Sequence, residues 1–291
     1  MTPTASPPKA TSFAYGEQYQ REQVEKHRAR TTNHWKPRIA LAHELIDTYA
    51  LPRLGAREPR TIKVLDVGCS IGTMAIEMAL RGFASYGVDF DVSALTIARQ
   101  LAAEEGAAVE FFQGDVAEWR PPMGGIDIAL CFDIFEHLHD DELGALLQSL
   151  RRVLSDRGSL VFYTFPLQYD YLFFSRDVLH WPLLPWRWLS TPAFERVVRA
   201  YAAACDTALL LTTGKSYKER IKAHSHCNPT TRARLEDVLQ RAGYRIAHIQ
   251  TGNLYPFKPH VTRRFAGHAV ADRHLYGVAY PASPTDRSDG R

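Results

Sequence analysis

Short apolar runs alternate with stretches that have the spacing of amphipathic helices through the middle of the chain. The apolar runs cover residues 62–67, 84–90, 109–114, 126–132 and 159–165. The helical stretches between them cover residues 74–80, 92–105 and 141–154. Strands that are apolar on both faces and alternate with helices are typical of a parallel sheet covered on both sides. We therefore predict an α/β fold whose ligands bind at the carboxyl ends of the strands.

The pattern changes on either side of this alternating region. Residues before it are helical and polar-rich, whereas the alternation stops after Pro166 and resumes with a helix at 231–242 and strands at 244–250 and 275–281. The interruption is too long for a structureless loop, so we predict a partly helical insertion there. The expected segments are disordered ends at 1–12 and 283–291, an N-terminal helical segment at 13–58, a core at 59–165 and 229–282, and an inserted substrate cap at 166–228.

Composition narrows the class of protein. The chain has 291 residues, and its 45% hydrophobic content is sufficient for a full core. The formal charge of +3 comes without a basic cluster, which argues against a nucleic-acid partner. No uncharged run approaches the roughly 20 residues of a spanning helix, and the start is unlike a signal peptide. The cysteines are scattered without a CxxC pair, so we expect a soluble, reduced, cytoplasmic protein. The oligomeric state does not follow from the sequence.

A glycine-containing turn links the first predicted strand to the first predicted helix. It reads Asp66-Val-Gly68-Cys69-Ser70-Ile-Gly72. Gly68 permits a tight turn with close backbone approach, and Gly72 lets the helix pack near the strand. A nicotinamide-dinucleotide turn would read GxGxxG, whereas three residues separate these glycines, so an NAD-linked oxidoreductase is disfavoured.

Acidic residues at the strand ends indicate a nucleoside. Asp89 ends the second strand, where a carboxylate can accept both hydroxyls of a ribose, and Asp115 ends the third, where it can accept an adenine amine. No Lys or Arg lies in the turn or directly after it, so a polyphosphate is poorly accommodated. The fitting ligand is an adenosine with a zwitterionic tail. Alternatively, Asp66 caps the following turn, Asp89 caps the following helix, and Asp115 forms an Asx turn.

Four motifs in order resemble those of the class I S-adenosylmethionine-dependent methyltransferases. They are Asp66–Gly72, Tyr86-Gly-Val-Asp89-Phe90, Gln113-Gly-Asp115-Val116 and Ile126-Asp-Ile-Ala-Leu-Cys-Phe132-Asp133. The resemblance implies S-adenosylmethionine as cofactor and a Rossmann-like, seven-stranded sheet whose last strand is antiparallel. Ser70 stands where the family frequently has a glycine.

The resemblance also implies roles for individual residues. The turn, including Cys69, would face the methionine part of the cofactor, and Asp89 would hold its ribose. Phe90 and Val116 would pack on the adenine, and Asp115 would meet its amine. The remaining cofactor residues implied by the resemblance are Phe132 beside the site, Asp133 near the methionine amine, and Arg38 at the cofactor carboxylate. A solvated helix arginine is the alternative for Arg38.

The segment after the fourth strand carries the candidate catalytic residues Glu136 and His137. A histidine that titrates near neutral pH suits a general base for a hydroxyl acceptor. The Glu-His pair is similar to that of the ubiquinone-biosynthesis O-methyltransferases, which favours O-methylation. N- or C-methylation and a non-catalytic, cofactor-binding protein remain alternatives, because related methyltransferases carry Glu-His without acting on hydroxyls. His224-Ser-His226-Cys227 lacks a fourth ligand at zinc-like spacing, so no metal is expected.

The predicted cap is rich in aromatic residues. They are Tyr169, Tyr171, Phe173, Phe174, Trp181, Trp186 and Trp188. Such a lining fits a small apolar or aromatic acceptor, for which Tyr169, Trp181 and His226 are the candidate binding residues. The alternatives are a small core within the cap, or peripheral contact of Trp and Arg side chains with a membrane surface, without stable insertion.

Overall fold

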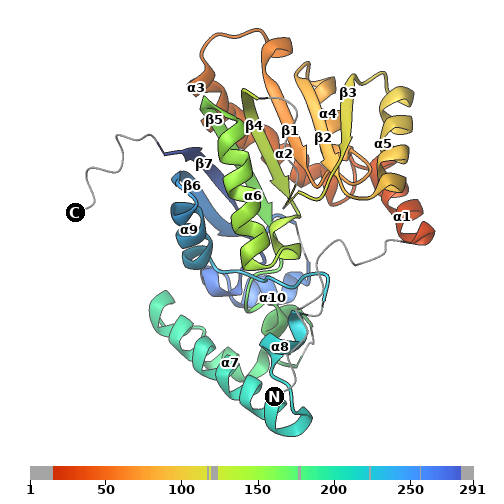
Figure 1. Ribbon diagram of the computed structural model, residues 1–291. Coiled ribbons are helices and arrows are strands. Elements are labelled where there is room, and N and C mark those ends of the chain that lie inside the picture. Colours follow the sequence, from red (N-terminus) through yellow and green to blue (C-terminus); the bar gives the residue numbers. More distant parts are fainter. Residues whose placement is uncertain are drawn as a thin grey trace, which may run out of the picture.

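The computed structural model describes residues 16–116, 118, 124–175, 178–222, 224–255 and 257–282, so the predicted disordered ends lie outside the described residues. A seven-stranded sheet in the order β3-β2-β1-β4-β5-β7-β6 forms its centre (Figure 1). The strands are β1 (Lys63–Val67), β2 (Ala84–Asp89), β3 (Val109–Gln113), β4 (Ile126–Phe132), β5 (Leu154–Thr164), β6 (Tyr244–Gly252) and β7 (His274–Pro281). Of these seven strands, six run in the same direction and β7 runs opposite to them. The predicted Rossmann-like sheet is therefore confirmed.

The boundaries follow the sequence pattern closely, with one difference at β5. This strand begins at Leu154 rather than at Ser159, because Leu154 pairs with Ile126 before a register shift. Regular pairing then starts where Ile128 meets Ser159. The polar residues that hid the start of the strand lie at this irregular, partly exposed end.

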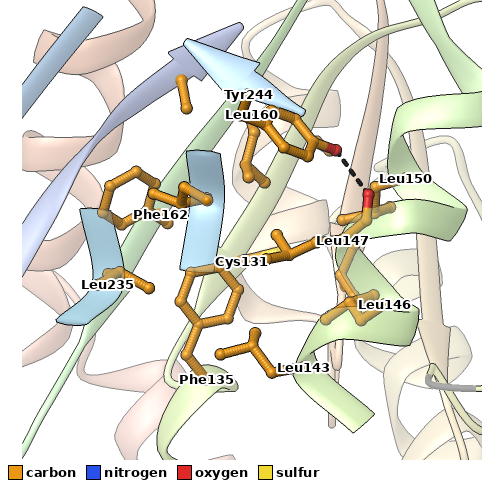
Figure 2. Close-up of a cluster of buried hydrophobic side chains, with 14 of the residues drawn as sticks. Cys131, Phe135, Leu143, Leu146, Leu147, Leu150, Leu160, Phe162, Leu235 and Tyr244 are labelled. Atoms are coloured by element: carbon orange, nitrogen blue, oxygen red, sulfur yellow. Dashed lines mark hydrogen bonds between the residues drawn. The ribbon is translucent and has the colours of Figure 1, made fainter. Parts of the chain in front are cut away.

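Apolar side chains bury both faces of the sheet, as the continuous apolar runs predict. All seven residues of β4 are buried. On one face α6 (Asp140–Val153) presents Leu143, Leu146, Leu147 and Leu150, which have the spacing of a single helical stripe. Figure 2 shows these leucines packed with Phe135, Phe162 and Leu235, the last from α9 (Arg232–Arg241). The Tyr244 hydroxyl donates a hydrogen bond to the Leu147 carbonyl at 2.9 Å, so the buried phenol is satisfied.

Helices from the first half of the chain cover the opposite face. They are α2 (Trp35–Leu45), a π-helical turn at Ile46–Ala50, α3 (Leu51–Leu54), α4 (Thr73–Leu80) and α5 (Val92–Glu104). Leu41, Leu45 and Met78 are among the buried residues that pack against β1, β4 and β5. A further helix, α1 (Glu17–Arg28), precedes α2 and lies beside α4 and α5, where it makes the polar contacts described below.

The cap is a separate helical layer at one end of the sheet (Figure 1). It contains a π-helical turn at Tyr171–Ser175, a 3-10 helix at Trp181–Trp186, α7 (Thr191–Thr213) and α8 (Tyr217–Ile221). Its own core joins Phe173, Leu183 and Phe194 to Val261 and Phe265. Because Val261 and Phe265 belong to or follow α10 (Pro259–Arg264), the β6–β7 connection is part of the cap and not of the core predicted at 229–282.

Strand pairing explains why two distant segments build one cap. Thr164 at the end of β5 pairs with Leu275, and Gly252 at the end of β6 pairs with His274. Both connections therefore leave the sheet at the same edge. None of the helices in the described parts of the chain combines the length and apolar character needed to cross a bilayer.

Candidate functional site

The glycine turn has the left-handed backbone that its sequence predicts. Gly68 and Gly72 have φ of +70° and +79°, and Ser70 between them has φ of +49°. The amides of Gly68 and Cys69 donate to the Val88 carbonyl at 2.8 and 2.9 Å, which fixes the turn against β2. A non-glycine residue at positive φ is uncommon and concentrates at functional sites. Ser70 therefore marks the turn as a candidate ligand-binding segment.

Asp89 holds this turn in place. Its Oδ2 accepts a hydrogen bond from the Ser70 amide at 2.7 Å, and its Oδ1 accepts one from the Asp91 amide at 2.9 Å. Asp91, and not Asp89, caps α5, because its Oδ1 accepts from the amides of Ser93 and Ala94 at 2.9 and 3.3 Å. Burial raises the pKa of Asp89, although the two amide hydrogen bonds lower it. The helix-cap alternative for Asp89 is thus wrong.

Asp66 caps the start of the following helix, which is the alternative role given for it above. Its Oδ2 accepts from the Ala75 amide at 3.1 Å in the first turn of α4. Burial raises its pKa to about 7. The side chain also lies in the wall of a cavity, so it fixes the helix start while facing the site.

A first cavity lies over the carboxyl ends of β2 and β3; we name it the β2 cavity. It encloses about 830 Å³ free of protein atoms, including its open mouth, which suits a small molecule. Asp89, Phe90, Asp115 and Val116 all line it. The structure thus brings together the four residues expected around a ribose and an adenine. Tyr19 and Gln20 of α1 complete the wall, and the sequence analysis did not identify them.

A second cavity adjoins it over β1, β4 and β5; we name it the β4 cavity. It encloses about 1150 Å³ free of protein atoms, again including open space. Gly68, Ser70, Asp133 and His137 line both cavities, so the two adjoin at the glycine turn. The predicted residues that line only the β4 cavity are Arg38, Asp66, Cys69, Phe132, Glu136 and His226. Gly72 lines neither cavity.

The absence of a side chain at Gly72 serves packing instead. A Cβ atom built there would lie 2.8 Å from Phe111 Cζ and 3.1 Å from Ala98 Cβ. These contacts are shorter than van der Waals separation allows. Gly72 therefore lets α4 approach the sheet, as its place in the motif predicts.

Arg38 and Asp133 form an ion pair at the β4 cavity. Arg38 Nε donates to Asp133 Oδ2 at 2.9 Å, and Nη2 donates to Oδ1 at 3.3 Å. The guanidinium carbon lies 4.9 Å from the Tyr163 ring centroid and 5.3 Å from that of Phe165. Arg38 is only 3% exposed, which rules out a solvated arginine. Its charge is compensated by Asp133, whose φ of +55° is also left-handed.

Lys26 of α1 is a further cation in the wall of the β4 cavity. Among the described residues, its ammonium group makes no ion pair or hydrogen bond. The nearby His34 is not a competing cation, because burial and the charges of Arg38 and Lys26 lower its pKa. Lys26 therefore supplies the uncompensated positive charge of this cavity. The sequence analysis missed it because α1 carries no motif.

Buried polar contacts fasten α1 to the core beside Lys26. His27 is fully buried; its Nδ1 lies 3.1 Å from Thr73 Oγ1 and its Nε2 lies 2.7 Å from Glu105 Oε1. Arg30 pairs with Glu77 and Glu105 through short contacts. These residues are far apart in the sequence, so only the fold reveals that α1 closes both cavities.

One ring nitrogen of His137, at the wall of both cavities, is held by a backbone carbonyl. Its Nδ1 lies 2.8 Å from the Ser225 carbonyl oxygen, which can only accept, so Nδ1 carries the proton. In the neutral ring, Nε2 then has a free lone pair. Burial lowers the pKa of His137 below its usual 6.5, which favours the neutral form. The arrangement suits a proton acceptor.

Glu136 and His226 adjoin His137. Glu136 Oε2 accepts from Thr164 Oγ1 at 2.8 Å, whereas its buried Oε1 has no hydrogen-bond partner among the described residues. Burial and the Asp133 charge raise the pKa of Glu136. The ring of His226 lies 4.8 Å from that of His137, and burial lowers its pKa to about 4.

These three side chains also form a group that can hold a metal ion. One potential ligand atom from each lies within 4.8 Å of the others. Two imidazoles and one carboxylate are ligands typical of divalent transition metals. Only the fold joins His226 to Glu136 and His137, which is why counting His224, His226 and Cys227 along the chain missed this group.

The structure does not bring the other two predicted acceptor residues to the site. Tyr169 lines a different cavity, between α7 and α8, together with Tyr171 and Tyr217. Trp181 is 57% exposed and lines none of these cavities. Both residues thus lie outside the β2 and β4 cavities, and their part in acceptor binding stays a prediction. Aromatic composition alone does not distinguish a pocket lining from an outer surface.

Comparison with known proteins identifies related sequences. A family model described as a methyltransferase domain matches residues 40–249, which is more than half of the chain. The chain is 34% identical over 107 residues to the ubiquinone biosynthesis O-methyltransferase of Histophilus somni strain 2336, covering 35% of this chain and 44% of that protein. It is 33% identical over 105 residues to that of Pseudomonas syringae pv. tomato, with 35% and 44% covered. The similarity thus spans less than half the length of these relatives.

Solved structures share the fold. An S-adenosylmethionine-dependent methyltransferase from Clostridium acetobutylicum superposes with a TM-score of 0.56 at 10% identity, covering 92% of this chain and 100% of that chain. A TehB-like methyltransferase from Corynebacterium glutamicum gives 0.52 at 14% identity, with 91% and 100% covered. The superpositions establish a common fold. Sequence identities this low leave the acceptor undefined.

Proposed function

Because this chain belongs to the S-adenosylmethionine-dependent methyltransferase family, we propose that it transfers a methyl group to the hydroxyl of a small apolar or aromatic acceptor. The match to ubiquinone biosynthesis O-methyltransferases over a third of the chain favours oxygen as the methylated atom. The free thiols of all four cysteines fit a reducing cytoplasm, where a role in small-molecule biosynthesis is expected.

The two cavities suit the two ends of the cofactor. In the β2 cavity, Asp89 would hold the ribose, Phe90 and Val116 would pack on the adenine, and Asp115 would meet its amine. Because the β4 cavity adjoins this cavity at Gly68 and Ser70, the methionine end would lie beside the turn on the β4 side.

Charged groups on the β4 side fit the amino and carboxylate groups of that end. Asp133 would accept from the amino group. Lys26 would pair with the carboxylate, since the charge of Arg38 is already compensated by Asp133. Arg38 would then act chiefly by orienting Asp133.

The placement of His137 is the observation that carries the proposal for hydroxyl chemistry. The bound sulfonium supplies an electrophilic methyl group and a leaving thioether that needs no acid. His137 lines both cavities, and its Nδ1 contact with the Ser225 carbonyl leaves Nε2 as the unprotonated nitrogen of the neutral ring. It would accept the hydroxyl proton as the oxygen attacks, while the buried walls exclude water. His226 would form the acceptor side of the β4 cavity.

Transfer of a labelled methyl group to a panel of phenols, amines and activated-carbon acceptors tests the proposal. We expect labelled methyl ethers, and a His137→Ala variant with much lower kcat but little change in cofactor affinity. Products methylated only at nitrogen or carbon would replace the proposal with the corresponding alternative. Cofactor binding without turnover on any acceptor would favour a non-catalytic protein.

The metal-binding capacity of Glu136, His137 and His226 supports a second way to activate the hydroxyl. A divalent cation held there would lower the pKa of a bound hydroxyl, and His137 would then be a ligand instead of a base. Dialysis against a chelator distinguishes the two: unchanged turnover supports the direct base, and loss that is restored by added cation supports the metal.

A further inference from the structure

Three tryptophans of the cap are exposed to solvent. Trp181, Trp186 and Trp188 are 57%, 49% and 80% exposed, and the neighbouring Leu189 is 38% exposed. Tryptophan is on average a highly buried residue, so three exposed copies within eight residues are unusual. We name these four residues the tryptophan surface. None of them lines the β2 or β4 cavity.

The fold fixes these side chains outward. Leu183 lies within the 3-10 helix and Phe194 follows the surface, and both are almost completely buried in the cap core. The Arg187 carbonyl, between Trp186 and Trp188, accepts a hydrogen bond from His268 Nε2 at 2.8 Å. The segment is therefore anchored at several points, and its tryptophans cannot turn inward without disrupting that core.

Basic residues lie within the segment that carries the tryptophan surface and on the helix beside it. Arg264 Nη1 lies 3.4 Å from His180 Nε2, and Thr191 Oγ1 donates to the Gly267 carbonyl at 3.3 Å, so α10 and the following turn run beside this surface. Both Arg263 and Arg264 are exposed. Segments 178–194 and 257–268 together contain Arg187, Lys258, Arg263 and Arg264 and no Asp or Glu.

We propose that the tryptophan surface docks on a lipid bilayer with anionic headgroups. An indole ring has an apolar body and a polar N–H, which suits the boundary between acyl chains and headgroups. Arginines beside it complement anionic phosphates. The charge pattern favours such a bilayer over a second copy of this chain, because identical basic faces would repel one another.

The segment that leads into α10 contacts the wall of the β4 cavity through Arg273. The guanidinium carbon of Arg273 lies 4.0 Å from the ring centroid of Phe257 and 5.8 Å from that of Phe165. Phe257 precedes α10, and Phe165 lines the β4 cavity. The same α10 region therefore contacts both the segment of the tryptophan surface and the wall of the β4 cavity. The docking itself depends only on the surface and not on the proposed reaction.

Vesicle co-sedimentation of the full chain tests the docking. We expect binding to vesicles of phosphatidylcholine mixed with phosphatidylglycerol, weaker binding to phosphatidylcholine alone, and loss of binding at high salt. The paired substitution Arg263→Gln with Arg264→Gln should reduce partitioning roughly tenfold or more. Trp186→Ser with Trp188→Ser should do the same and abolish any vesicle-induced blue shift of tryptophan fluorescence.

A matched control lies at the other end of the cap. Leu210 and Leu211 are 44% and 81% exposed near the end of α7, outside the tryptophan surface, and their replacement by Ser should leave binding unchanged. Thermal melts and S-adenosylhomocysteine affinity of each variant verify an intact fold and cofactor site. Absence of wild-type binding, equal binding of all variants, or a dimer in light scattering that only the tryptophan variant loses would each overturn the proposal.

Discussion

Replacing Lys26 with Met is expected to weaken cofactor binding, and only through the loss of an interaction with the carboxylate of the cofactor. Among the residues that the structure describes, Lys26 is the cation in the wall of the β4 cavity that has no ion-pair partner, because Asp133 neutralises Arg38. Methionine keeps the length and apolar stem of the side chain while it removes the charge. The substitution therefore isolates the electrostatic contribution of α1 to cofactor binding.

The magnitude follows from the partial exposure of Lys26. An ammonium and a carboxylate about 4 Å apart attract by about 4 kcal/mol at an effective dielectric constant of about 20. Desolvation and solvent screening offset most of this at a half-buried site, leaving a net contribution of about 1–2 kcal/mol. That contribution corresponds to a Kd increase of about 5- to 30-fold for a ligand that carries the carboxylate.

Calorimetry with two ligands makes the expectation specific. S-adenosylhomocysteine carries the carboxylate, so its Kd should rise by about 5- to 30-fold. Methylthioadenosine lacks the carboxylate, so it should bind the variant as tightly as it binds the wild type. Lys36→Met is the matched control, since Lys36 is exposed on α2 and lines neither cavity. Equal losses for both ligands, or an unchanged Kd for S-adenosylhomocysteine, would refute the assignment of Lys26 to the carboxylate.

The remaining predictions concern the glycine turn, the ribose and the proton acceptor. Asp89→Asn should weaken the binding of S-adenosylhomocysteine and methylthioadenosine alike, because both contain the ribose. Calorimetry that finds the Kd of either ligand unchanged contradicts the role of Asp89 at the ribose. Gly72→Ala should destabilise the protein by about 2–5 kcal/mol, from left-handed strain together with overlap with neighbouring side chains. Gly106→Ala, at φ of +66° in open space, should cost only the strain of about 1–2 kcal/mol, and urea unfolding of both variants measures the difference. Because burial lowers the pKa of His137, which acts unprotonated, kcat/KM should be flat above pH 6.5 and fall only below it; a rise in rate on acidification excludes the base.

The sequence by itself determined the family and the sheet. Four ordered motifs predicted the S-adenosylmethionine-dependent methyltransferase family and its seven-stranded sheet, and both predictions are confirmed. The reason is that apolar strands and the glycine turn are local features. Their periodicity and backbone conformation depend on a few consecutive residues. The same locality explains why Asp89, Phe90, Asp115 and Val116 could be predicted as neighbours, since the ends of adjacent parallel strands meet at one edge.

Contacts between distant segments were decided only by the tertiary structure. Lys26 reaches the site because buried His27 binds Glu105 across the fold, and His226 reaches His137 because the cap returns over β4. The β6–β7 connection joined the cap because β5 and β6 end at one sheet edge. Whether an aromatic side chain lines a pocket or faces outward was likewise undetermined, since Trp181 and Phe173 belong to the same apolar class. Their burial depends on which neighbours the folded chain supplies, and no local pattern encodes that choice.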